Sequence, residues 1–112
     1  MLTRRQPEQR ASQNLEYGDL RLETDTFQLS CRERSVRLSR KEFDMLELLM
    51  RSREMVLTKE NLILKLWGYE SDAEDNNVEV YISFLRKKLD YLHSKVKIRT
   101  IRMVGYRLEQ ET

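Results

Sequence analysis

Residues 76–108 read NNVEVYISFLRKKLDYLHSKVKIRTIRMVGYRL, and this stretch decides the fold because it combines one long amphipathic helix with a hairpin. A rotation of about 100° per residue places its apolar side chains on one stripe, which we expect to face the core. The stripe consists of Val78, Tyr81, Ile82, Leu85, Leu89 and Leu92. The stripe predicts a helix that includes these six residues and ends near His93.

The residues behind this helix alternate as in two short strands. Val96, Ile98 and Thr100 are separated by basic residues, and Tyr106-Arg107-Leu108 follows a turn at 103–105. Gly105 stands where a hairpin often needs a positive φ. The pattern predicts a C-terminal β-hairpin.

The same stretch concentrates positive charge. It holds eight lysines and arginines against only Glu79 and Asp90, whereas the whole chain has a net charge of +2, so the remaining residues are net negative. A basic surface on a helix and a hairpin suits a polyanion, and this shape favours double-stranded DNA.

The helix face opposite the core stripe has a composition suited to a DNA groove. Val80 and Phe84 can pack against thymine methyl groups, and Glu79 can accept from the cytosine N4 amine. Asn77 can donate to a phosphate or pair with adenine, and Ser83 lies on the same face. Packing of Phe84 on a neighbouring element is the alternative.

Cations on the helix and the hairpin are candidates for the DNA backbone. Arg102 precedes the hairpin tip, from which it can enter a narrow, A·T-rich minor groove. We expect the phosphate contacts to come from Asn76, Arg86, Lys87, Lys97 and Arg99.

Two further helices precede this stretch. Ser39 to Glu42 forms a capping box and predicts a helix over 40–53, whereas Thr58 caps a shorter helix through Trp67 that ends at Gly68. The second and third helices form a helix-turn-helix, and the basic hairpin beside them is a wing.

Three alternating segments over 15–38 predict a small antiparallel sheet, so the fold class is α+β: a small N-terminal sheet, three helices and a hairpin wing. We place this domain at 15–109. The polar segment 1–14 is expected to be a flexible tail or linker, whose arginines offer possible phosphate contacts.

Nothing in the sequence favours catalysis. The single His93 lacks a metal-ligating partner, and the chain has no phosphate-binding glycine loop, so we expect no enzyme, cofactor or metal. The single Cys31 is expected to pack in the core of a cytoplasmic protein. No apolar run is long enough to cross a membrane.

Several motifs, in this order, resemble the OmpR/PhoB family of winged-helix effector domains from bacterial two-component response regulators. They are Leu66-Trp67-Gly68, Val78-Glu79-Val80-Tyr81-Ile82-Ser83-Phe84-Leu85-Arg86-Lys87-Lys88-Leu89 and Ile101-Arg102-Met103-Val104-Gly105-Tyr106-Arg107. The resemblance covers about residues 15–108. It implies a transcription regulator that reads DNA sequence with helix 75–92 in the major groove and Arg102 in the minor groove.

Two positions depart from the family pattern. Ser83 and Phe84 stand where many members place arginines, which weakens the case for guanine readout from the middle of the helix. Met103 stands where the wing often has glycine, so the conformation of the tip is not given by the resemblance.

The resemblance also implies partners. The loop before the third helix contacts RNA polymerase in some members, and here it holds Glu70, Asp72, Glu74 and Asp75, which alternatively form a solvated loop that favours the helix N-terminus. Residues 2–5 resemble the end of a receiver domain that precedes this module in the full-length protein. We expect a monomer in solution that pairs head to tail on direct repeats in promoters.

A protein-interaction module is the main alternative, because the same basic face suits an acidic partner. Such a surface more often carries an extended apolar patch, and only Val80 and Phe84 stand out here. RNA binding is less favoured, since no aromatic stacking platform is evident.

Overall fold

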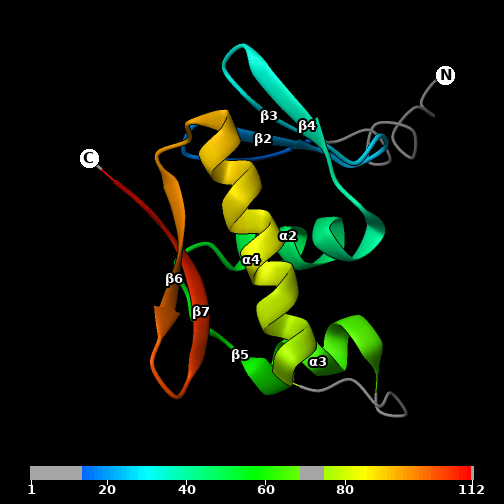
Figure 1. Ribbon diagram of the computed structural model, residues 1–112, viewed down its shortest axis with the longest axis vertical. Helices are drawn as coiled ribbons and strands as arrows, with labels where there is room; N and C mark the ends of the chain where they lie inside the picture. Colours follow the sequence, from blue (N-terminus) through cyan, green and yellow to red (C-terminus); the bar gives the residue numbers. More distant parts are fainter. Residues whose placement is uncertain (1–13, 69–74, 112) are drawn as a thin grey trace, which may run out of the picture.

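A computed structural model describes residues 14–68 and 75–111 of the chain. A four-stranded antiparallel sheet lies at one end of the molecule, three helices follow, and a C-terminal hairpin packs beside the third helix (Figure 1). This is the winged-helix arrangement predicted from the sequence. In order, the elements are β1 Asn14–Tyr17, β2 Leu20–Glu23, β3 Gln28–Cys31, β4 Arg34–Arg37, α2 Arg40–Ser52, β5 Leu57–Thr58, α3 Lys59–Trp67, α4 Asp75–Leu92, β6 Val96–Ile101 and β7 Gly105–Gln110.

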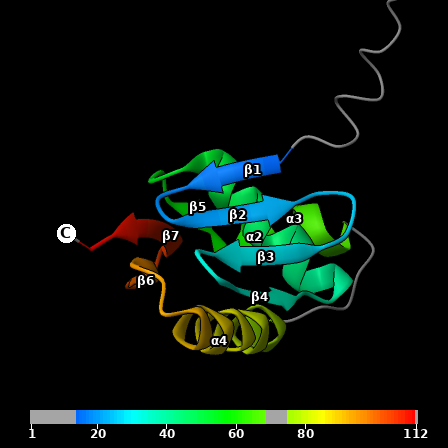
Figure 2. The ribbon, with the colours of Figure 1, turned by 90° about the horizontal axis from the view of Figure 1, so that it is seen from above.

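The N-terminal sheet buries one of its faces on the helices, as Figure 2 shows from above. Its register places Leu15 opposite Leu22, Leu22 opposite Leu29, and Leu29 opposite Val36. Leu22 and Leu29 are fully buried in the core with Cys31. The sheet has four strands rather than three, because the first predicted segment folds back on itself at Gly18, whose φ is +59°. β1 begins at Asn14, the last residue of the predicted tail.

The helices begin where their caps predict. The Ser39 hydroxyl accepts from the Glu42 N–H at 3.3 Å and the Ser39 N–H donates to the Glu42 carboxylate at 2.8 Å, which completes the capping box of α2. Thr58 caps α3 by accepting from Asn61 N–H at 3.0 Å. α4 spans 75–92 as expected, and its apolar stripe is buried, apart from the partly buried Tyr81. No helix within the described ranges is long and apolar enough to cross a membrane.

Strand β5 was not predicted. It pairs with β7, so the hairpin is part of a three-stranded sheet in the order β5-β7-β6. The role expected of Gly105 is therefore wrong in one respect: the positive φ of the turn belongs to Met103, at +62°. Gly105 is needed because a Cβ there would overlap the Leu57 carbonyl oxygen of β5.

Asp19 fastens the N-terminal sheet to the start of the hairpin. Its carboxylate accepts from the Ser94 hydroxyl at 2.6 Å and from the Lys95 backbone N–H at 2.9 Å. Burial acts to raise the pKa of Asp19, but these hydrogen bonds outweigh it and hold the pKa below its ordinary value. The contact fixes the junction from which β6 leaves α4.

Candidate nucleic-acid interface

Two apolar side chains of α4 remain exposed on its outer face. Val80 and Phe84 keep 45% and 42% of their surface exposed, and with Glu79 and Ser83 they line a shallow hollow of about 380 Å³. The Phe84 ring meets the edge of Tyr81 on the same helix, with centroids 5.8 Å apart. Four of the five predicted groove-facing residues therefore share one accessible surface, and Asn77 is exposed near the start of the same helix.

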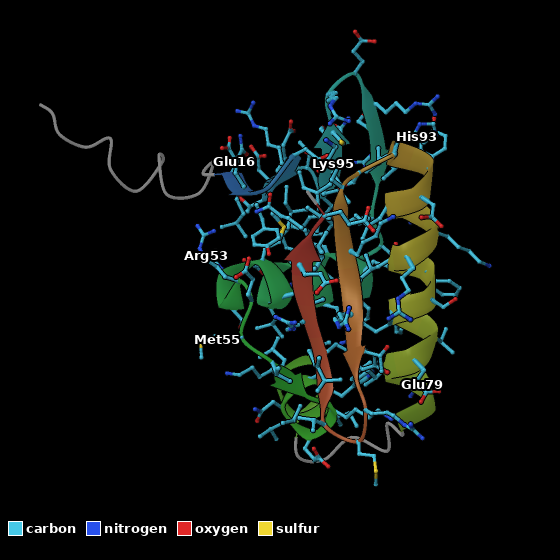
Figure 3. All side chains as sticks on the ribbon, turned by 90° about the vertical axis from the view of Figure 1, so that its left-hand side faces the viewer. Glu16, Arg53, Met55, Glu79, His93 and Lys95 are labelled. Carbon is cyan, nitrogen blue, oxygen red and sulfur yellow. The ribbon has the colours of Figure 1, made fainter. Side chains whose placement is uncertain are left out.

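Glu79 is held by a cation that sequence reasoning missed. Lys59, the first residue of α3, places its ammonium 3.3 Å from the Glu79 carboxylate. Glu79 retains more than half of its side-chain exposure, so the carboxylate stays accessible at the end of α4 that lies near the hairpin tip (Figure 3). Nothing in the spacing of these two residues along the chain predicts their contact.

Arg86 binds the hairpin in this structure. Its guanidinium donates to the Ile98 carbonyl at 2.7 Å and to the Thr100 hydroxyl at 2.8 Å. These bonds tie the middle of α4 to β6 and fix the wing against the helix. Arg86 was expected to contact phosphate, and that role stays a prediction.

The other four cations that were predicted to contact DNA fall into two groups. Lys97 lies 3.8 Å from Asp90, and Arg99 lies 3.2 Å from Glu109, so carboxylates of the protein offset part of their charge. Lys87 and Arg102, by contrast, are exposed and have no ion pair or hydrogen bond within residues 14–68 and 75–111. Their charges are available to an external anion.

The wing tip and the start of α4 lie at the same end of the molecule, opposite the N-terminal sheet (Figure 1). Arg102 occupies the turn that the Val104 N–H closes on the Ile101 carbonyl at 2.9 Å. His93 and Lys95 lie at the other end of α4 (Figure 3). The start of the helix and the tip of the wing therefore both carry exposed polar, apolar or cationic groups at this end of the molecule.

Some predicted residues lie outside the described structure. These are the loop carboxylates Glu70, Asp72 and Glu74, the side chains of Asp75 and Asn76, and residues 1–13 of the tail. Trp67, just before the loop, contacts the Lys41 ammonium, 5.1 Å from its ring centre, and the Tyr81 ring, whose centroid is 6.0 Å away. Within the described part of the chain, no three histidine, cysteine or acidic side chains lie close enough to hold a metal ion.

Comparison with known proteins gives consistent results. Residues 33–108 match the family described as "Transcriptional regulatory protein, C terminal". The chain is 46% identical over 103 residues to the transcriptional regulatory protein DltR of Streptococcus agalactiae, covering 92% of this chain and 46% of DltR. It thus spans about half the length of the curated relatives it matches.

Two solved structures have the same fold. One is the DNA-binding domain of the response regulator AdeR in complex with an intercistronic region, at 26% identity and a TM-score of 0.75, covering 86% of this chain and 99% of that one. The other is the C-terminal domain of the nisin resistance regulator NsrR, at 33% identity and a TM-score of 0.73, covering 88% and 99%.

Proposed function

Because the chain belongs to the OmpR/PhoB-type family of transcriptional regulatory protein C-terminal domains, we propose that it binds specific sequences of double-stranded DNA and thereby controls transcription. α4 enters the major groove, Arg102 of the wing enters the adjacent minor groove, and cations beside them contact phosphates. The observation that carries this proposal is the exposed hollow of α4 together with Lys87 and Arg102, two exposed cations of the same helix and its wing that have no partner within the described residues.

The experiment that tests the proposal is selection of bound duplexes from a random DNA pool, followed by sequencing, at two salt concentrations. We expect enrichment of one short half-site, repeated in the same orientation about one helical turn apart. Binding should weaken steeply as salt rises, because phosphate contacts release counterions. Absence of binding at low salt would contradict the proposal and favour the protein-interaction alternative.

Replacement of Lys87 by alanine is expected to weaken binding to every duplex and to reduce the slope of log K against log salt by about one unit, since one phosphate contact is lost. Lys95→Ala is the matched control, because Lys95 is an exposed cation beyond the C-terminal end of α4, at the end of the molecule away from the wing tip. Fluorescence anisotropy titrations over a salt series measure both slopes. Equal slopes for wild type and Lys87→Ala would remove Lys87 from the interface.

Replacement of Glu79 by glutamine is expected to change which base pair is enriched at one position of the half-site, because the amide can donate as well as accept. The control is Glu47→Gln, which likewise removes a carboxylate that pairs with a cation, here the partly exposed Glu47, 3.0 Å from Arg51 on α2. Repeating the selection with both variants measures the effect. An unchanged half-site for Glu79→Gln, or a change produced by Lys87→Ala instead, would show that the helix faces are assigned wrongly.

The partners follow from the same proposal. Two copies pair head to tail on direct repeats, a receiver domain precedes the module in the full-length protein, and the acidic loop before α4 contacts RNA polymerase. The domain acts in the cytoplasm, by binding rather than by catalysis. The support for these statements is the family and the named regulators among the relatives.

A further inference from the structure

The tip of the wing carries an apolar side chain that lies outside the hydrophobic core. Met103 is 99% exposed and the neighbouring Val104 is 46% exposed. Neither side chain covers the core, which lies between the helices and the two sheets. The tip therefore presents apolar surface to solvent at the end of a basic hairpin.

The backbone at Met103 makes this choice of residue unfavourable for folding. Its φ of +62° lies in the left-handed region, which glycine and asparagine adopt at a lower cost in free energy than methionine. A residue that neither packs nor suits its backbone is a candidate for a contact with something outside the chain.

Position and charge indicate what that contact is. Met103 directly follows Arg102, whose guanidinium is exposed and unpaired within the described residues, and the tip lies at the same end of the molecule as the start of α4 (Figure 1). When α4 occupies a major groove, the tip meets the adjacent minor groove. Unbranched methionine is slender and flexible enough for a groove about 6 Å wide.

We infer that Met103 is an apolar wedge that inserts between two stacked base pairs in the minor groove while Arg102 contacts the groove beside it. The inference rests on the proposed function and adds to it a preference for one kind of base-pair step. Apolar side chains inserted in this way unstack a step and kink the duplex. Pyrimidine–purine steps such as TA and CA/TG unstack most easily, so the wing selects a flexible step without hydrogen bonds to its bases.

Three variants separate the wedge from the turn. Met103→Gly and Met103→Asn both suit the left-handed backbone but remove the apolar group, whereas Met103→Leu keeps an apolar group of similar volume. Circular dichroism and thermal unfolding check that all three fold. Because the glycine and asparagine variants suit the turn, a loss of DNA readout in them cannot be attributed to a damaged wing.

The test is the random-duplex selection, carried out in parallel with wild type and the three variants. We expect wild type and Met103→Leu to enrich the half-site together with a pyrimidine–purine step at a fixed distance from it. Met103→Gly and Met103→Asn should enrich the same half-site without that step. Replacing the pyrimidine–purine step of the selected duplex by another type of step should weaken wild-type binding on the order of fivefold. The same replacement should leave the binding of Met103→Gly unchanged.

A second readout reports the unstacking itself. With 2-aminopurine placed at the selected step, wild type should increase the fluorescence on binding and Met103→Gly should not. If all four proteins enrich the same half-site and the same step, or none enriches a step, the wedge is overturned while the proposed function stands. If wild type enriches no half-site, the proposed function fails and the wedge fails with it.

Discussion

Replacement of Gly105 by alanine is expected to lower the free energy of unfolding by about 3 kcal/mol. The added Cβ would push two backbone segments apart, whereas a flexible side chain in the place of the β5 backbone could move aside. A Cβ at this position would overlap the Leu57 carbonyl oxygen and lie 2.8 Å from the Thr58 Cα. Gly105 pairs with Thr58 in the ladder between β5 and β7. Since Thr58 also caps α3, separation of the two strands disturbs the helix-turn-helix as well as the wing.

Urea unfolding at neutral pH measures this effect, and Gly68→Ala is the matched control. Gly68 has a positive φ of +89°, but a Cβ there would meet no atom of the described residues within 4 Å. Its replacement should therefore cost only the strain of an alanine at φ +89° and ψ 177°, about 2 kcal/mol. If the two variants lose equal stability, the close approach of β5 is not what requires glycine at position 105.

Replacement of Lys88 by methionine is expected to destabilise the protein by about 3 kcal/mol at pH 7, because it leaves the buried carboxylate of Glu42 without its counter-charge. The Lys88 ammonium lies 2.6 Å from that carboxylate, whose side chain is only 6% exposed. The contact joins the first turn of α2 to α4, so it positions the helix that carries the candidate interface.

The effect should depend on pH in a defined direction. Burial acts to raise the pKa of Glu42, but hydrogen bonds from Lys88 and from the Ser39 backbone outweigh it and hold the pKa below the ordinary 4.5. The stabilisation is therefore complete above pH 4.5 and is lost as pH falls through the lowered pKa of the folded state. Lys88→Met should consequently cost less stability in acid than at pH 7.

The double variant Glu42→Gln/Lys88→Met is the control for this pair. Glutamine preserves the capping box and carries no charge, so the double variant should recover much of the stability lost in Lys88→Met. Urea unfolding at pH 7 and in acid compares the three proteins. A loss that is the same at both pH values, without recovery in the double variant, would mean that Lys88 acts through packing alone.

Local signals in the sequence were sufficient to predict where the helices α2 and α3 begin and where α3 ends. Ser39 with Glu42 located the start of α2, and Thr58 and Gly68 located both ends of α3, since caps are determined by residues within one turn. The apolar stripe of α4 predicted its buried face, and the resemblance to the family supplied its bounds, 75–92. β5 was missed because a strand of two residues has no alternation to detect and forms only through its pairing with β7.

The partners of the charged side chains could not be predicted, since they depend on distances across the fold. Counting charges over 76–108 overstated the positive charge available on the wing, because Glu109 follows that stretch and pairs with Arg99. Arg86 binds β6, and Glu79 meets Lys59 of another helix. Only the three-dimensional arrangement shows that, among the cations predicted to contact DNA, Lys87 and Arg102 have no ion pair or hydrogen bond within the described residues.

The most direct test of the DNA-binding surface is a map of backbone amide chemical shifts by NMR as a selected duplex is added to the 13.6 kDa protein. We predict that the largest changes fall on residues 77–87 of α4 and 99–104 of the wing, with little change in β1–β4. Changes centred on the four-stranded sheet, with α4 and the wing unaffected, would contradict the assignment of this surface to DNA.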